Sequence, residues 1–360
     1  MIQDPIRFHP GLESPDETEP QVTADLIAAL QQILETTSED YGHAVRAVHA
    51  KSHGLIEAEL TVLDGLAPEY AQGLFATAGT HPAVIRLSIN PGDLLADSIS
   101  VPRGLALKLL KVEGERLPGA EGDTQDFVMV NGPVFVAPDA ETFLGSLKLL
   151  AKTTDRAEWA KKALSAVLRG AERVIEAVGG ESATLKTMGG APNVHPLGER
   201  YFTQTAYRYG DHVAKLSLVP VSASLTRHGG ERIEVDGRHD AIREDVDRAM
   251  REGPAEWELR VQLCRDPEAM PIEDPTVLWD EAESPFVTVA RLRAEAQPGW
   301  SEDRAERIDE AMRFSPWTGL EAHRPLGSVN RVRKATYEAS ADFRSRFNRC
   351  PMHEPSQLAG

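Results

Sequence analysis

The clearest pattern along the chain is an alternation of apolar and polar residues in short segments. In residues 55–63, "LIEAELTVL", the side chains of Ile56, Ala58, Leu60 and Val62 fall on one face of an extended chain. The same period of two, or a short apolar run, recurs in residues 83–88, 104–112, 126–137, 212–225 and 255–264. Short strands at this spacing predict an antiparallel sheet or barrel.

Other segments follow the helical period instead. Residues 23–42 carry apolar side chains at helical spacing, with Thr23 as the expected N-cap. Residues 139–178 are also expected to be helical. A last helix is predicted over about residues 328–347, and it should end before Pro351.

These elements suggest one main domain with two short appendages. Residues 1–40 are expected to form an N-terminal arm and the first helix, because the first 20 residues are rich in Pro, Asp and Glu. Residues 41–348 form the main domain in this reading, with a long loop over 179–201. Residues 349–360 are expected to form a C-terminal tail.

Composition narrows the class of protein. The chain has 360 residues, 41% hydrophobic and 26% charged, and a formal net charge of −17. An acidic chain repels phosphate, so nucleic acid is not an expected partner. No apolar run approaches the roughly 20 residues of a membrane span, and the first residues do not resemble a signal peptide. Cys264 and Cys350 have no metal-site spacing, so we expect a cytoplasmic protein without a disulfide framework.

Candidate chemistry appears first in the last helix. Arg333, Tyr337 and Arg344 are spaced i, i+4 and i+11, which places them on nearly the same helical face. A solvated charged stripe with one anchored tyrosine would explain this pattern. A chemical reading is also open, because a cation one turn away favours the phenolate form of Tyr337, and phenolate is a known haem iron ligand.

The first strands carry polar residues where apolar ones are expected. Arg86 and Ser88 are two apart and point to one side of a strand, where they need a buried anion or a polar partner. His49, in "RAVHAKSHG", would alone be read as a structural residue at the foot of a strand. Asn131, beside Gly132 and Pro133, would alone be a turn residue.

Taken together, these segments resemble the haem catalases and their smaller catalase-related relatives. The resembling blocks occur in the family's order within residues 41–345: "RAVHAK" (46–51), "AVIRLS" (83–88), "VPRGLALKL" (101–109), "DFVMVNGPVFVAPDAETF" (126–143), "YFTQTAYRYGDHVAKL" (201–216), "PTVLWDEAESPFVTVARL" (275–292), "FSPW" (314–317) and "RKATY" (333–337). The resemblance implies an α+β fold, an antiparallel β-barrel with surrounding helices, and haem b buried beside the barrel.

The resemblance also implies a role for each matching residue. His49 would be the distal acid–base group, Asn131 its polar partner, and Ser88 the group that bonds the far nitrogen of His49. Tyr337 would bind the haem iron, and Arg333 would bond its phenolate. Six further residues would contact haem: Val48 on its face, Gly104 and Phe135 in the cavity wall, and Arg46, Arg86 and Arg344 at the propionates.

Three functions are compatible with this resemblance. The first is a haem peroxidase with organic donors and weak catalase activity, acting on hydrogen peroxide or organic hydroperoxides. The second is a rearranging enzyme for fatty-acid hydroperoxides, as in the family's allene oxide synthases. Those enzymes carry threonine directly before the distal histidine, whereas this chain has Val48, which favours the first. The third is a haem-binding protein without turnover. A homo-oligomer is expected in each case, and nothing in the sequence indicates an NADPH site.

Overall fold

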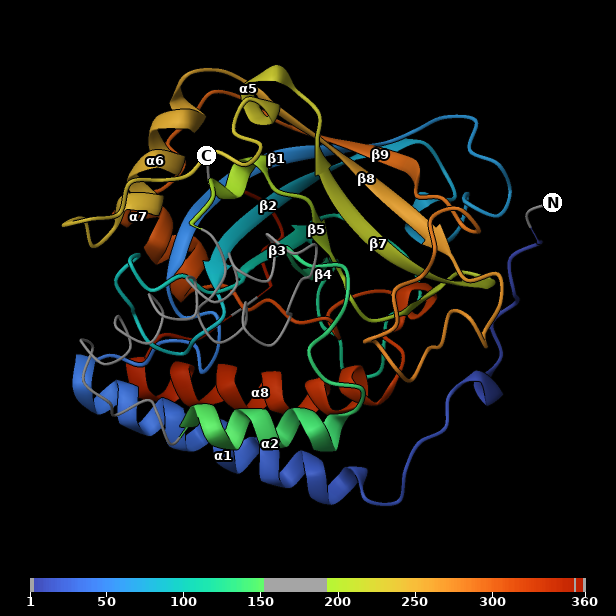
Figure 1. Ribbon diagram of the computed structural model, residues 1–360, viewed down its shortest axis with the longest axis horizontal. Helices are drawn as coiled ribbons and strands as arrows, with labels where there is room; N and C mark the ends of the chain where they lie inside the picture. Colours follow the sequence, from blue (N-terminus) through green and yellow to red (C-terminus); the bar gives the residue numbers. More distant parts are fainter. Residues whose placement is uncertain (1–2, 152–192, 353, 359–360) are drawn as a thin grey trace, which may run out of the picture.

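Nine strands and six α-helices make up the computed structural model, which describes residues 3–151, 193–352 and 354–358 (Figure 1). The strands are β1 (Ser52–Val62), β2 (Gly79–Ile89), β3 (Arg103–Leu109), β4 (Gln125–Val130), β5 (Tyr201–Phe202), β6 (Tyr207–Tyr209), β7 (His212–Pro220), β8 (Ala255–Leu263) and β9 (Val287–Ala294). The helices are α1 (Glu19–Tyr41), α2 (Ala140–Ala151), α5 (Ala223–Thr226), α6 (Ala241–Arg251), α7 (Glu302–Arg304) and α8 (Ser328–Asn348).

The strands close into an antiparallel barrel. Their order is β5-β4-β3-β2-β1-β9-β8-β7-β6, and a further pairing of β5 with β7 joins the two ends, leaving β6 as an outer partner of β7. Closure removes the open edges that would otherwise invite aggregation. The α+β class and the antiparallel barrel predicted from the sequence are therefore confirmed.

Strand β2 shows why the barrel wall can carry both a core and a site. Ala83, Ile85 and Leu87 belong to the apolar cluster inside the barrel. Their neighbours Val84, Arg86 and Ser88 point to the outer face, and all six side chains are buried. Both faces of this strand are therefore covered by protein, and the outer face is the one with polar groups.

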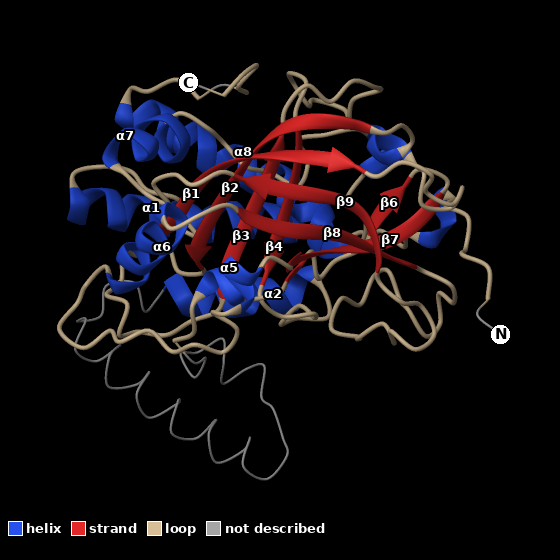
Figure 2. Ribbon diagram, turned by 90° about the horizontal axis from the view of Figure 1, so that it is seen from above, coloured by secondary structure: helices blue, strands red, loops and turns tan. Residues whose placement is uncertain are grey.

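Helices cover that outer face. In Figure 1, α1, α2 and α8 lie together as a layer on one side of the barrel, and Figure 2 shows the same arrangement from above. Their apolar side chains form a second cluster, which includes Leu26 and Ile33 of α1, Leu144 of α2 and Val332 of α8. No helix among the described residues has the length and apolar character needed to cross a membrane.

Two element boundaries differ from the sequence-based expectation. Helix α1 begins at Glu19 instead of residue 23, and its N-cap is Thr18, because Pro20 in the first turn favours a helical start. The strand expected over 212–225 ends at Pro220, and the following residues turn into α5.

A third boundary also differs, because the strand expected over 126–137 is β4, which ends at Val130 and is followed by an irregular segment. The last helix, expected over 328–347, is α8. Of the helix expected over 139–178, α2 covers the start, and residues 152–178 lie outside the described residues. The same holds for residues 179–192 of the expected long loop.

Candidate functional site

A cavity lies between the outer face of β2, β3 and β4 and the helix α8. Most of the site residues predicted from the sequence line it: Arg46, Val48, His49, Arg86, Ser88, Gly104, Arg333, Tyr337 and Arg344. They come from the segment between α1 and β1, from two strands and from α8. The fold thus brings together groups that are up to about 300 residues apart in the chain.

The position of His49 is set by a row of residues across the barrel wall. Ser88 of β2 pairs with Gly104 of β3, and the imidazole of His49 lies against this pair. The His49 Nδ1 atom is 3.1 Å from Ser88 Oγ. A Cβ atom at position 104 would lie only 2.4 Å from the imidazole, so no residue larger than glycine fits there without displacing the ring. His49 itself has a left-handed backbone, with φ of 57°.

The surroundings of His49 keep its imidazole neutral. Burial lowers the pKa of His49, and the positive charges of Arg86, Arg333 and Arg46 lower it further, to about 3. The ring is therefore unprotonated throughout the neutral range and able to accept a proton. The influence of Arg333, which belongs to α8, shows that the two walls of the cavity lie within electrostatic range of each other.

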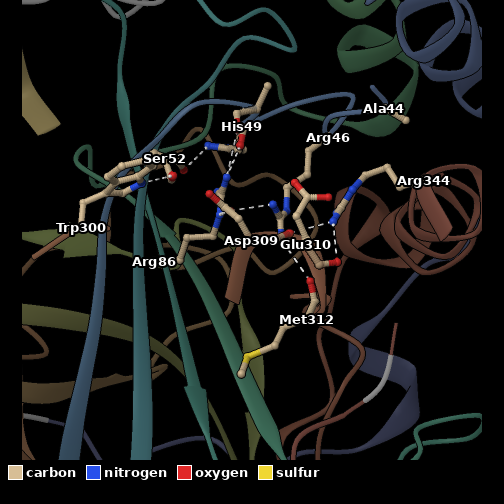
Figure 3. A network of polar contacts seen from close by, with 12 residues as sticks. Ala44, Arg46, His49, Ser52, Arg86, Trp300, Asp309, Glu310, Met312 and Arg344 are labelled. Atoms are coloured by element: carbon tan, nitrogen blue, oxygen red, sulfur yellow. Dashed lines mark hydrogen bonds and ion pairs between the residues drawn. The ribbon is translucent and has the colours of Figure 1, made fainter. Parts of the chain in front are cut away.

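Three arginines predicted to meet propionates gather around one residue, Asp309 (Figure 3). Arg46 Nη1 is 2.8 Å from Asp309 Oδ1, and Arg86 Nε is 2.5 Å from the same oxygen. Arg344 Nη2 donates to the backbone carbonyl of Asp309, at 2.8 Å. Arg86 also donates to the carbonyl of His49, at 2.8 Å, which connects the arginine cluster to the histidine.

The three guanidinium groups of this arginine cluster (Arg46, Arg86, Arg344) outnumber the two carboxylates near them. Asp309 is the carboxylate that contacts it from the buried side, and Glu310 lies at the rim, where it contacts His43. Burial raises the pKa of Asp309. The charges of Arg86 and Arg46 outweigh burial and hold that pKa well below its ordinary value. Burial lowers the pKa of Arg344 to about 10, so it stays charged at neutral pH.

We expect Asp309→Asn to lower the free energy of unfolding by about 3 kcal/mol, the scale for removing one partner of a buried ion pair. Because the folded pKa is depressed, the contribution is present at neutral pH and is lost as the pH falls below the ordinary carboxyl range. Urea denaturation at pH 7 and at about pH 2, which is well below the ordinary carboxyl pKa, measures both effects. The control is Asp211→Asn, which breaks an exposed pair with Arg7 and should change stability by less than about 0.5 kcal/mol. Equal effects of the two variants would contradict this assignment.

On the opposite wall, Tyr337 and Arg333 lie one turn apart on α8. Arg333 Nη1 donates to Asn330 Oδ1, at 3.1 Å, and its guanidinium lies 5.2 Å from the centre of the Phe135 ring. Asn330 is fully buried and donates to the carbonyls of Ala206 and Leu326. These contacts hold Arg333 in place from two sides.

Two of the predicted site residues are not among those that line the cavity. The amide of Asn131 is occupied elsewhere, because its Oδ1 accepts from the backbone N–H of Arg103, at 2.8 Å, and its Nδ2 donates to Glu199, at 2.7 Å. Phe135 packs against Phe143 and under the guanidinium of Arg333. Both adjoin cavity residues, since Asn131 follows Val130 and Phe135 contacts Arg333.

The structure adds two residues that sequence reasoning missed. Asp309 lies in the π-helical segment Ala305–Glu310, far in sequence from the arginines it contacts. Gln204 lines the cavity with φ of 61°, a left-handed conformation that is uncommon for residues other than glycine. Neither residue belongs to an alternating or helical pattern of apolar positions in the sequence. Gln204 does lie within the segment "YFTQTAYRYGDHVAKL" (201–216), which resembles catalases.

Comparison with solved structures identifies the architecture. A fungal catalase superposes with a TM-score of 0.61 and 19% identity, over 88% of this chain and 63% of its own. The chain has a catalase-like fold. Catalase A from Saccharomyces cerevisiae gives a TM-score of 0.59 and 16% identity, over 97% and 69% of the two chains. A bacterial catalase gives 0.58 and 17%, over 98% and 66%.

The sequence comparisons give no match: no protein-family model and no curated protein sequence matches this chain. The catalase-like chain spans less than two thirds of the length of the fungal catalase. Identities of 16–19% carry the fold to this chain and leave its activity to be argued from the site.

The residues that line the catalase-like cavity fit haem. Gly104 leaves room for the His49 imidazole in one wall, the arginine cluster has positive charge for two propionates, and Tyr337 offers an oxygen ligand from the other wall. No group of three or more His, Cys, Asp or Glu side chains within the described ranges is arranged to hold a metal ion.

Proposed function

We propose that this protein binds haem b in the cavity between the barrel and α8 and reduces hydroperoxides with electrons from organic donors. The reaction is ROOH + AH₂ → ROH + H₂O + A, in which the O–O bond breaks and the donor is oxidised. Weak dismutation of hydrogen peroxide accompanies it. The observation that carries the proposal is the neutral His49, bonded to Ser88 and facing a cavity that Tyr337 also lines.

Each residue has a defined task in this proposal. Haem iron, when bound, supplies the site of electron exchange with the peroxide. His49 takes a proton from one peroxide oxygen and returns it to the leaving oxygen, which is general acid–base catalysis. In the reactive tautomer the Nδ1–H of His49 would donate to Ser88 Oγ, 3.1 Å away, which would leave Nε2 as the base. Tyr337 would hold the iron, and Arg46, Arg86 and Arg344 would hold the propionates.

The competing functions are less well supported by the site. A protein that only stores or senses haem has no need of a histidine held by Ser88 over a glycine. An allene oxide synthase-like rearrangement is disfavoured by Val48, which stands where those enzymes carry threonine. The proposal also includes a cytoplasmic location and a homo-oligomeric state.

The deciding experiment is a visible spectrum of the protein expressed with ample haem, followed by two peroxide assays. We expect the absorption of ferric haem with a phenolate ligand, oxidation of an organic donor on adding hydrogen peroxide, and slow oxygen evolution. A colourless protein would contradict every haem-based function. A haem protein that converts fatty-acid hydroperoxides to epoxides without a donor would favour the rearranging enzyme instead.

The balance between the two peroxide activities is expected to depend on Val101. In common catalases the segment that resembles "VPRG" carries aspartate at this position, along the channel that hydrogen peroxide enters. Here Val101 is buried with Ile89, Leu95 and Ile99 in an apolar cluster. We propose that this cluster borders the way into the cavity, where an apolar lining would steer a small polar peroxide less well and admit larger organic substrates.

We therefore predict that Val101→Asp raises oxygen evolution relative to donor oxidation. Parallel assays of both activities on the haem-loaded protein measure the ratio. Val101→Asn is the matched control, because it adds polarity without charge and should change the ratio less. A ratio that is the same in all three proteins would argue against a role for this position, as would a wild type that evolves oxygen as fast as a common catalase.

A further inference from the structure

Gln204 occupies the tip of a tight turn in the cavity wall. The turn follows β5, and the N–H of Thr205 donates to the carbonyl of Thr203, at 2.7 Å. The hydroxyl groups of the two threonines close the turn from both sides: Thr203 Oγ1 donates to the Thr205 carbonyl, and Thr205 Oγ1 donates to the Thr203 carbonyl. These bonds hold Gln204 in its left-handed conformation, which glycine would adopt without strain.

The side chain of Gln204 forms hydrogen bonds with the backbone of the segment after β4. Its Nε2 atom donates to the carbonyl of Gly132, at 3.0 Å, and to the carbonyl of Val134, at 2.5 Å. Asn131, the first residue of this segment, is held on its other side by Glu199 and by the backbone of Arg103. The β4 ladders end at Val130, so residues 131–134 have no strand partner among the described residues, and side-chain bonds hold them instead.

The same turn is tied to the helix that carries Tyr337. Thr205 Oγ1 lies 3.2 Å from Asn330 Oδ1, and that oxygen accepts from Arg333, at 3.1 Å. A chain of hydrogen bonds therefore runs from the segment beside Asn131, through the turn of Gln204, to the arginine one turn before Tyr337. A strained residue that is held by so many bonds and lies in a cavity wall points to a function.

We propose that Gln204 is a positioning residue, which clamps residues 131–135 so that Asn131 is held beside the cavity in a single conformation. The inference rests on the proposed function for its meaning, because the resemblance to catalases, and not a contact with the cavity, assigns Asn131 a part in the peroxide reaction. The clamp itself is a property of the folded chain and can be measured without haem. Gln204 acts through Asn131 and through the fixed backbone, and it transfers no proton itself.

The test compares Gln204→Glu and Gln204→Gly with wild type. Glutamate keeps the size of the side chain but faces the two carbonyls with acceptors, whereas glycine removes the clamp and relieves the left-handed backbone. The matched control is Gln72→Glu, because Gln72 donates its amide to the carbonyl of Pro68, at 2.8 Å, and does not line the cavity. Thermal unfolding shows whether each variant is folded, and the glycine variant is expected to fold at least as well as the glutamate variant.

The first readout is the side-chain amide signal of Asn131 in full-length protein labelled with ¹⁵N-asparagine, assigned by its disappearance in Asn131→Asp. Both Gln204 variants should shift this signal and speed its hydrogen exchange by about tenfold, the scale for losing a hydrogen bond of about 1.4 kcal/mol. Gln72→Glu should leave it unchanged. An unshifted signal with unaltered exchange in a folded Gln204 variant would overturn the clamp.

The second readout is the rate of reaction with hydrogen peroxide in haem-loaded protein. Both Gln204 variants should retain haem with the wild-type spectrum and react about tenfold more slowly. An altered Asn131 signal with an unchanged rate would show that the position of Asn131 does not affect the reaction with peroxide. A wild type that binds no haem would contradict the proposed function alone, and the amide signal would still decide whether Gln204 holds the segment.

Discussion

Replacing Tyr337 by phenylalanine is expected to remove the phenolate character of the haem spectrum and to weaken haem retention severely. The substitution keeps the aromatic ring and deletes the phenolic oxygen that α8 places at the cavity. The measurement is the visible spectrum and the haem-to-protein ratio after gel filtration.

A second tyrosine provides a matched control for this prediction. Tyr207 is fully buried and lies within electrostatic range of both Arg333 and Tyr337, but it does not line the cavity. Tyr207→Phe should therefore keep the haem and its spectrum. Tyr337→His should restore haem binding with the spectrum of an imidazole ligand. If Tyr337→Phe has the wild-type spectrum, or if Tyr207→Phe loses it, the ligand is wrongly assigned.

Local pattern was sufficient to predict the parts of the site that lie on regular elements. The period of two in residues 83–88 placed Arg86 and Ser88 on one side of a strand, and both face the cavity from β2. The helical spacing of Arg333, Tyr337 and Arg344 placed them on one face, and all three line the cavity from α8. In both cases the geometry of a single element decides where a side chain points.

The parts that pattern could not predict depend on contacts between distant segments. Asp309 neutralises arginines that lie more than 200 residues away in the chain, and it does so from a π-helical turn that no periodicity marks. Gln204 adopts a left-handed conformation because two threonine hydroxyl groups and two distant carbonyls hold it there. The amide of Asn131 is directed by Glu199. These contacts can be seen only once the barrel has closed.

The electrostatics of the cavity have a consequence for how its histidine works. Burial and three neighbouring arginines lower the pKa of His49 to about 3, from an ordinary value near 6.5. The imidazole is therefore neutral over the whole range in which the protein would function. The rate of reaction with peroxide should show no inflection from His49 between about pH 5 and pH 8, and deprotonation of His49 should not limit it.

His49→Ala is expected to leave haem bound and to slow the reaction with hydrogen peroxide by roughly 100-fold or more, the usual scale for losing an acid–base group. Haem should remain because its proposed ligand, Tyr337, belongs to the opposite wall of the cavity. His49→Asn separates chemistry from backbone strain, since asparagine tolerates the left-handed φ of 57° but cannot carry the proton.

The measurement for His49 is stopped-flow mixing of haem-loaded protein with hydrogen peroxide. His43→Ala is the matched control, because His43 contacts Glu310 at the rim of the arginine cluster and does not line the cavity. It should react at the wild-type rate. Both His49 variants should be slow to a similar degree, which would separate the loss of proton transfer from any relaxation of the backbone. A wild-type rate in either folded His49 variant would show that the proton is carried by another group.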